Sequence, residues 1–132
     1  MEKILLMIAA ASGVSAVGLG AFGAHALKPQ FDATQLSLWE TAVQYQFWHT
    51  LALLFVVVLA LQSLSSRWLL MSGWCFVVGV VLFSGSLYFM ALSELRSLVG
   101  FPIGLLTPLG GMAFIAGWLL LLLATATGKV LA

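Results

Sequence analysis

The sequence predicts an all-α fold, an integral membrane four-helix bundle. Of its 132 residues, 63% are hydrophobic and 7% are charged, whereas an average soluble domain has about 25% charged residues. Its five basic and four acidic residues leave four uncharged windows, 4–27, 41–66, 68–93 and 97–128. Each window exceeds the ~20 residues that a helix needs to cross ~30 Å of hydrocarbon. We therefore predict a single transmembrane domain with four spans, at about 4–27, 33–62, 68–92 and 107–127.

The first span is rich in small residues. Ala24-His25-Ala26 resembles a signal-peptidase site, but the apolar run is longer than the ~7–15 residues of a signal peptide, so we predict that it is retained. Pro29 ends the helix because proline disfavours helical geometry in the residue before it. Small side chains let a neighbouring backbone approach closely. We interpret this span as the central helix, with a seam that packs within the bundle or, alternatively, forms a homo-oligomer interface. That seam repeats at every fourth position: Ser12, Ala16, Gly20 and Ala24.

The second span carries the polar face on which the functional prediction depends. Asp32 and Gln35 have the spacing of a capping box, so a helix should begin near residue 33. An imidazole and a phenol at hydrocarbon depth need partners, so the face that holds Tyr45 and His49 should point toward other helices. At spacings of three and four, that face comprises Thr41, Tyr45, Trp48, His49, Ala52 and Val56.

The third and fourth spans offer further small-residue seams. Ser72, Gly79 and Ser86 recur every seven residues in the third span, which predicts a packing seam. The connection 93–106 interrupts an apolar run with glycine and proline, so we interpret it as an interfacial or partly re-entrant lid. Thr107 and Pro108 fit the N-cap and first position of the fourth helix, which Gly117 thins further on.

The polar residues of one membrane side form the candidate site. His25 ends the first helix, the start of the second helix lies on the same side, and the end of the third returns to it. An alternative for His25 is an interfacial residue near the last helix carbonyls. We predict one polar cluster beneath the lid, lined by His25, Glu40, Gln44, Tyr45, His49, Ser86 and Tyr88.

Charge placement predicts the orientation of the chain. Lys3, Arg67 and Lys129 fall on one side of the membrane and Lys28 and Arg96 on the other. The positive-inside rule therefore predicts that both termini are cytoplasmic. The net charge of +1, without a basic cluster, argues against nucleic acid as a partner.

Three functions are compatible with these patterns. The first is a non-enzymatic protein that binds or passes a small or lipid-like ligand at a polar pocket on the non-cytoplasmic side. The second is an accessory or assembly subunit of a larger membrane complex. The third is a metal or haem site, or a membrane enzyme, that uses His25 and His49. Two histidines without a third ligand are a weak metal pattern, and no nucleophile with a positioned base is visible, so we predict no metal, no cofactor and no catalytic residue.

Several motifs resemble those of one family. The chain is similar to the small four-span membrane proteins grouped as YgdD and transmembrane protein 256, whose domain has no assigned function. The resemblance covers nearly the whole chain and implies a bacterial inner-membrane setting, with the lipid bilayer as partner, but it implies no activity. The motifs that carry it are GAFGAHALK at 20–28, WETAVQYQFWH at 39–49, GSLY at 85–88, TPLGG at 107–111 and GW at 117–118.

Overall fold

The computed structural model describes residues 1–62, 67–92 and 103–127, and this part of the chain is helical without strands. Its four spans are each long and apolar enough to cross a membrane, so the predicted all-α membrane bundle is confirmed. These spans are Glu2–Leu27, Ala33–Leu61, Arg67–Leu92 and Ile103–Thr127. The elements are α1 (Glu2–Phe22), the π-helical turn η1 (Gly23–Leu27), α2 (Ala33–Leu61), α3 (Arg67–Gly79), the π-helical turn η2 (Val80–Ser84), α4 (Gly85–Leu92), the 3₁₀ turn η3 (Ile103–Leu105) and α5 (Leu106–Thr127).

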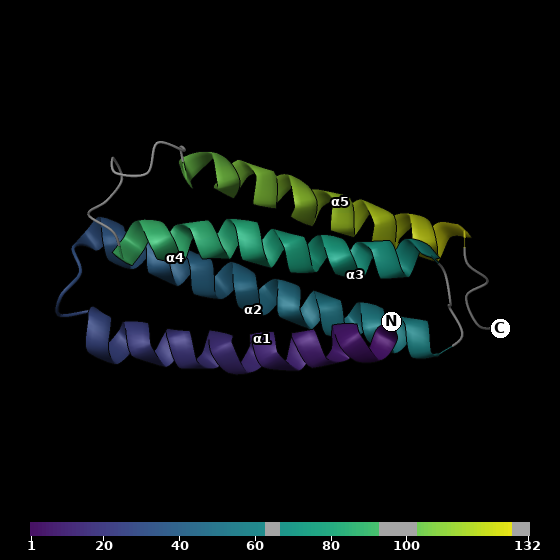
Figure 1. The fold of residues 1–132 in the computed structure, drawn as a ribbon, viewed down its shortest axis with the longest axis horizontal. Coiled ribbons are helices and arrows are strands. Elements are labelled where there is room, and N and C mark those ends of the chain that lie inside the picture. The colour runs from purple at the N-terminus through teal and green to yellow at the C-terminus, as the bar shows by residue number, and fades with distance from the viewer. Residues whose placement is uncertain (63–66, 93–102, 128–132) are drawn as a thin grey trace.

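The four spans run antiparallel in chain order, with α1 and α5 on opposite sides of the bundle and the other two spans between them (Figure 1). The helix α1 packs mainly against α2, and α3 packs mainly against α5. Within the most apolar 18 residues of each span, 17% of the residues are buried in the first span and 44% in the second. The expectation that the first helix is central is therefore wrong. Its small side chains bring it close mainly to α2, and α2 is the central helix.

The start of α2 is fixed as the sequence predicts. The backbone N–H of Gln35 donates to Asp32 Oδ1 at 2.7 Å, and the backbone N–H of Asp32 donates to Gln35 Oε1 at 3.0 Å. This reciprocal pair satisfies donors that a helix start otherwise leaves free. The side-chain amide of Gln35 also donates to Ala91 O at 3.1 Å, which joins the start of α2 to the end of α4.

Glycines allow α5 to approach the third span closely. A Cβ at Gly79 would overlap the ring of Phe114, and one at Gly117 would lie 2.6 Å from the ring of Phe76. A Cβ at Gly110 would collide with the backbone of Phe83 in η2. Helix crossings at such short range are possible only where a residue lacks a side chain. The third-span seam predicted at Ser72, Gly79 and Ser86 is buried.

The start of α5 differs from the prediction. The helix begins at Leu106 and follows the η3 turn, so Thr107 is a helical residue and not its N-cap. The hydroxyl groups of Thr107 and Ser86 are hydrogen-bonded at 2.7 Å. The preceding 3₁₀ turn already leads the chain into the helix, and Ser86 offers the threonine a partner. Residues 93–102 of the predicted lid lie outside the described residues.

Candidate functional site

A buried glutamine joins three spans at the middle of the bundle. Gln46 is 5% exposed and lies one residue from the midpoint of α2. Its Nε2 donates to Ser15 Oγ at 2.7 Å and to Ser12 O at 3.1 Å, both on α1. Its Oε1 accepts a hydrogen bond of 2.8 Å from the hydroxyl of Tyr88 on α4. A carboxamide at this depth has no water with which to form hydrogen bonds, so these protein hydrogen bonds offset the cost of burying it.

Two hydroxyl groups complete the set. Thr50 Oγ1 donates to Gln46 O at 2.7 Å and lies 2.6 Å from Ser12 Oγ. The hydroxyl of Ser15 donates to Ser12 O at 2.9 Å. We call these five connected side chains the Gln46 network: Ser12, Ser15, Gln46, Thr50 and Tyr88. In the described residues, no buried side-chain nitrogen or oxygen lacks a hydrogen-bond partner.

His49 lies next to this network but belongs to an aromatic cluster. Its Nδ1 is 2.8 Å from Tyr45 O, and because a carbonyl can only accept, Nδ1 carries the proton. Its Nε2 accepts from Trp118 Nε1 at 3.3 Å. The imidazole also stacks on Phe114 with ring centroids 3.5 Å apart and an interplanar angle of 11°. His49 is therefore a neutral imidazole with both nitrogens engaged.

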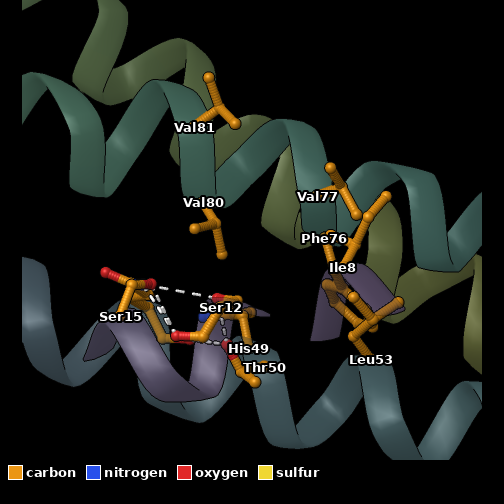
Figure 2. Close-up of a pocket in the computed structure, with 11 residues that line it drawn as sticks. Ile8, Ser12, Ser15, His49, Thr50, Leu53, Phe76, Val77, Val80 and Val81 are labelled. Atoms are coloured by element: carbon orange, nitrogen blue, oxygen red, sulfur yellow. Dashed lines mark hydrogen bonds between the residues drawn. The ribbon is translucent and has the colours of Figure 1, made fainter. Parts of the chain in front are cut away.

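A cavity of about 200 Å³ lies beside the Gln46 network, between α1, α2 and the third span. We call it the Gln46 cavity. In Figure 2, Val80 points from the third span toward Ser12 and Ser15 across this space. Its rim includes Ser15 and Val81, which are exposed on the outside of the bundle, so the cavity opens sideways. Its lining is Ile8, Ser12, Ser15, Gln46, His49, Thr50, Leu53, Phe76, Val77, Val80 and Val81.

The predicted single polar cluster does not form. His25 is exposed, and it follows Ser12 by 13 positions in the sequence. Ser12 is hydrogen-bonded to Thr50, the neighbour of His49, so His25 lies roughly 20 Å along the axis from His49 at 1.5 Å per residue. The clustering prediction for these two histidines is wrong because a polar side chain near a helix end reaches the headgroup layer and needs no protein partner.

Two of the predicted residues lie at a different hollow. Glu40 and Gln44 are exposed on α2 and do not reach His49. They line a space of about 190 Å³ between the ends of α1 and α2. Neither His25, His49 nor Tyr88 is in its wall, which consists of Gly20, Gly23, Ala24, Trp39, Glu40, Val43 and Gln44.

The remaining candidates divide between different surroundings. Tyr88 is part of the Gln46 network and also packs on Trp39, with ring centroids 4.7 Å apart. Tyr45 stacks on Phe83 at 4.5 Å and is near His49. Ser86 donates to Phe83 O at 2.8 Å and pairs with Thr107. Of these candidates, the network contains only Tyr88.

One member of the face predicted to point inward does not. Trp48 is 53% exposed, so this prediction is wrong for it, although His49, Ala52 and Val56 are buried as expected. Trp48 lies one residue from the midpoint of α2, on the outside of the bundle.

The predicted α1 seam is only partly covered by protein. Ala16 is buried, Ser12 and Gly20 are half-buried, and Ala24 is exposed. A Cβ at Gly20 would lie 3.4 Å from Val43 Cγ1, which is an ordinary contact distance. The seam therefore packs against α2 in the middle of the first span, and at Ala24, near the end of that span, it no longer does.

Sequence reasoning missed Gln46, Ser15 and Thr50 as site residues. A signal was present, because a glutamine at the centre of an apolar span needs partners at the same depth, and Ser12 and Ser15 lie near the middle of the first span. Gln44 was expected with Glu40 at the rim of the pocket, but it is exposed, and Gln46, two positions further on, is the glutamine that points into the bundle.

The cavity lining is uncharged, and its polar groups are amide, hydroxyl and imidazole. Within residues 1–62, 67–92 and 103–127, no three His, Cys, Asp or Glu side chains gather as a metal site would require. The arrangement can hold an uncharged molecule by contact with aliphatic side chains and by hydrogen bonding to the network.

Comparison with known proteins finds a family profile and several membrane-protein relatives that match the chain. The profile of a family described as "Protein of unknown function (DUF423)" matches residues 19–111. The chain belongs to this DUF423 family. The matched range includes Gln46, His49, Thr50 and Tyr88 but not Ser12 or Ser15.

Named relatives of this DUF423 chain are bacterial membrane proteins. The UPF0382 inner membrane protein YgdD of Escherichia coli K12 is 46% identical over 121 residues, which cover 92% of this chain and 88% of YgdD. A UPF0382 membrane protein of Staphylococcus epidermidis is 42% identical, covering 93% of this chain and 95% of its own length. The UPF0382 membrane protein YwdK of Bacillus subtilis is 39% identical, covering 92% and 95%. No solved structure matches the chain.

Proposed function

We propose that this small membrane protein is non-enzymatic and binds a small or lipid-like molecule in the Gln46 cavity, which the molecule enters from the bilayer. The observation that carries the proposal is the placement of a hydrogen-bonded amide and three hydroxyl groups beside an uncharged space of about 200 Å³. Polar groups inside a membrane bundle are costly and commonly mark a site of function. This proposed site lies at mid-span, whereas the sequence led us to expect a pocket near the non-cytoplasmic surface.

The size of the cavity suits part of a lipid-like molecule. An apolar cavity of about 150 Å³ in a soluble protein accommodates benzene, so the Gln46 cavity has room for one ring or a short length of chain. Aliphatic lining from Ile8, Leu53, Val77 and Val80 provides contact for such a group. The rest of a longer ligand would extend past Val81 into lipid.

The arrangement of the helices supports lateral entry. The helix α1 packs mainly on α2 and makes few contacts with α3. The opening of the cavity lies along this thinly packed boundary, where Ser15 and Val81 face outward. A ligand can therefore reach the Gln46 network from the hydrocarbon without crossing the headgroup layer.

The test is native mass spectrometry of the protein released from mild detergent after purification from membranes. We expect a reproducible adduct on the wild type that is lost from Val80→Phe, because the larger ring fills the cavity. Val78→Phe is the matched control, since Val78 lies on the same span, is 45% exposed and does not line the cavity. An adduct that persists on Val80→Phe, or no adduct on any variant, would overturn the proposal.

We also propose that the membrane is the bacterial inner membrane and that both termini are cytoplasmic. Support comes from the name of the E. coli relative and from the sequence positions of the basic residues, three on the side of the termini and two on the other. A reporter enzyme that is active only in the periplasm, fused after Ala132, should score negative, and the same reporter fused after Lys28 should score positive. The opposite pair of results would reverse the orientation.

A further inference from the structure

The hydrogen bonds of the Gln46 network restrict the chemistry of what the cavity can hold. The hydroxyl of Thr50 donates to Gln46 O, so the short contact between Thr50 and Ser12 must use the hydrogen of Ser12. The hydroxyl of Ser15 donates to Ser12 O, and that of Tyr88 donates to Gln46 Oε1. Each of the four hydroxyl hydrogens already has an acceptor.

The nitrogen donors around the cavity are used as well. The two hydrogens of Gln46 Nε2 are directed at Ser15 Oγ and at the carbonyl of Ser12. The Nδ1–H of His49 is bonded to Tyr45 O, and its Nε2 receives the indole N–H of Trp118. No donor hydrogen among the polar side chains that line the cavity is left for a ligand.

Acceptor capacity remains. A hydroxyl oxygen has two lone pairs, and Ser15 Oγ uses one of them for Gln46. Ser15 also lies at the rim, where an entering molecule first meets the polar groups. Thr50 Oγ1 likewise accepts a single bond, from Ser12. The polar side of the cavity therefore offers lone pairs and requires a partner that brings its own hydrogen.

We propose that the Gln46 cavity selects an apolar molecule with a neutral hydroxyl group, which donates a hydrogen bond to Ser15 Oγ. This inference rests on the proposed function and specifies its ligand class. Ketones, esters and ethers offer only lone pairs. They cannot form a hydrogen bond with the polar side of the cavity, which also offers only lone pairs. Carboxylates and phosphates add a charge that no lining residue neutralises. Of these groups, a hydroxyl loses the least hydrogen-bonding free energy when it moves from water or the headgroup layer into this site, because it can donate to Ser15 Oγ.

The experiment compares 4-hexylphenol with 4-hexylanisole, which has the same ring and chain but carries a methyl ether in place of the hydroxyl. The protein is placed in lipid nanodiscs with labelled Ile, Leu and Val methyl groups, and the shifts of Ile8 and Val77 are followed as each probe is added. The exposed Val58 reports effects of the probe on the surrounding lipid. 1-Decanol and decyl methyl ether form a second pair, which separates a phenolic ligand from an aliphatic one.

For the wild type we expect the hydroxyl probe of at least one pair to bind about tenfold more tightly than its ether, as one hydrogen bond in a desolvated site implies. Ser15→Ala removes the acceptor and frees one N–H of Gln46 toward the cavity. In this variant the preference should disappear or reverse, while binding to the aliphatic wall remains. Thr125→Ala is the matched control, because Thr125 bonds only within α5 and lies away from the cavity.

The possible results separate the two proposals. If both ethers bind as tightly as their hydroxyl partners, and Val80→Phe abolishes binding of all of them, the cavity binds ligands but the hydroxyl inference is wrong. If Ser15→Ala keeps the full preference, the donor argument is wrong. If none of the four probes shifts Ile8 or Val77 more than Val58, the proposed binding function fails together with the inference.

Discussion

The bond between Tyr88 and Gln46 should couple the stabilities of α4 and α2. Tyr88→Phe leaves Gln46 Oε1 without its donor, and Gln46→Leu leaves the Tyr88 hydroxyl without its acceptor. An unmet group in a desolvated site costs about 1–3 kcal/mol, so each single variant should lose that much free energy of unfolding. Gln46→Leu should lose more of it, because it also removes the bonds to α1.

The double variant removes both partners of the bond, so its loss should be smaller than the sum of the single losses. Double-mutant cycles on hydrogen bonds between membrane helices average about 0.6 kcal/mol and reach about 1.7. We expect a coupling energy of about 1 kcal/mol, because the hydrogen bond is short, at 2.8 Å, and both groups lie away from water. The assay is reversible unfolding in mixed micelles with increasing SDS, followed by tryptophan fluorescence.

The control cycle pairs Tyr88→Phe with Gln44→Leu, which removes the same side chain from an exposed position of α2. These two changes should be additive. The reasoning would be refuted if the cycle of Tyr88 with Gln46 were additive within ~0.3 kcal/mol, or if the control cycle coupled as strongly.

Two further variants test the packing. Gly110→Ala should lower the free energy of unfolding by about 1–3 kcal/mol, because its Cβ collides with the backbone of Phe83, whereas Gly20→Ala should cost far less; SDS unfolding measures both. Trp39→Phe should lose about 1 kcal/mol or more in the same assay, since Trp39 is 3% exposed and its indole N–H donates to the backbone of α1. Trp48→Phe, at a 53% exposed position, should melt like the wild type, and equal effects of the two tryptophan changes would contradict the assignment.

Much of the fold follows from composition and local signals. Hydrocarbon tolerates long apolar helices and few charges, so the four charge-free windows locate the spans. The capping pair of Asp32 and Gln35 fixes the start of α2 because it is a purely local hydrogen-bonded structure. Such features depend on neighbours in the chain, and the sequence therefore contains the information that determines them.

The site could not be predicted in the same way because it depends on how helices are rotated against one another. Spacings of three and four on α2 allow a face that includes Trp48 or one that includes Gln46. The choice is made by Ser12 and Ser15, which meet Gln46 only once α1 has its actual register.

The two π-helical turns are a second feature that sequence reasoning did not detect. A π-turn inserts one extra residue into a helix and shifts the side chains that follow it by about 100° relative to a regular α-helix. The turn η2 interrupts the third span beside the Gln46 cavity and ends at Ser84, whose hydroxyl donates to Ala42 O on α2. Ser86 follows the turn and donates to Phe83 O. No simple periodicity of apolar residues shows where such an insertion falls.

The way in which Gln46 is paired has a consequence for biogenesis. Membrane helices are delivered in chain order as synthesis proceeds. The first two spans can satisfy both amide hydrogens of Gln46 as soon as they form a hairpin, through Ser12 and Ser15. The amide oxygen receives its donor, Tyr88, only when the third span arrives. The nascent hairpin therefore holds one unpaired acceptor in the bilayer, and the pairing of that acceptor favours capture of the third helix over its diffusion away into lipid.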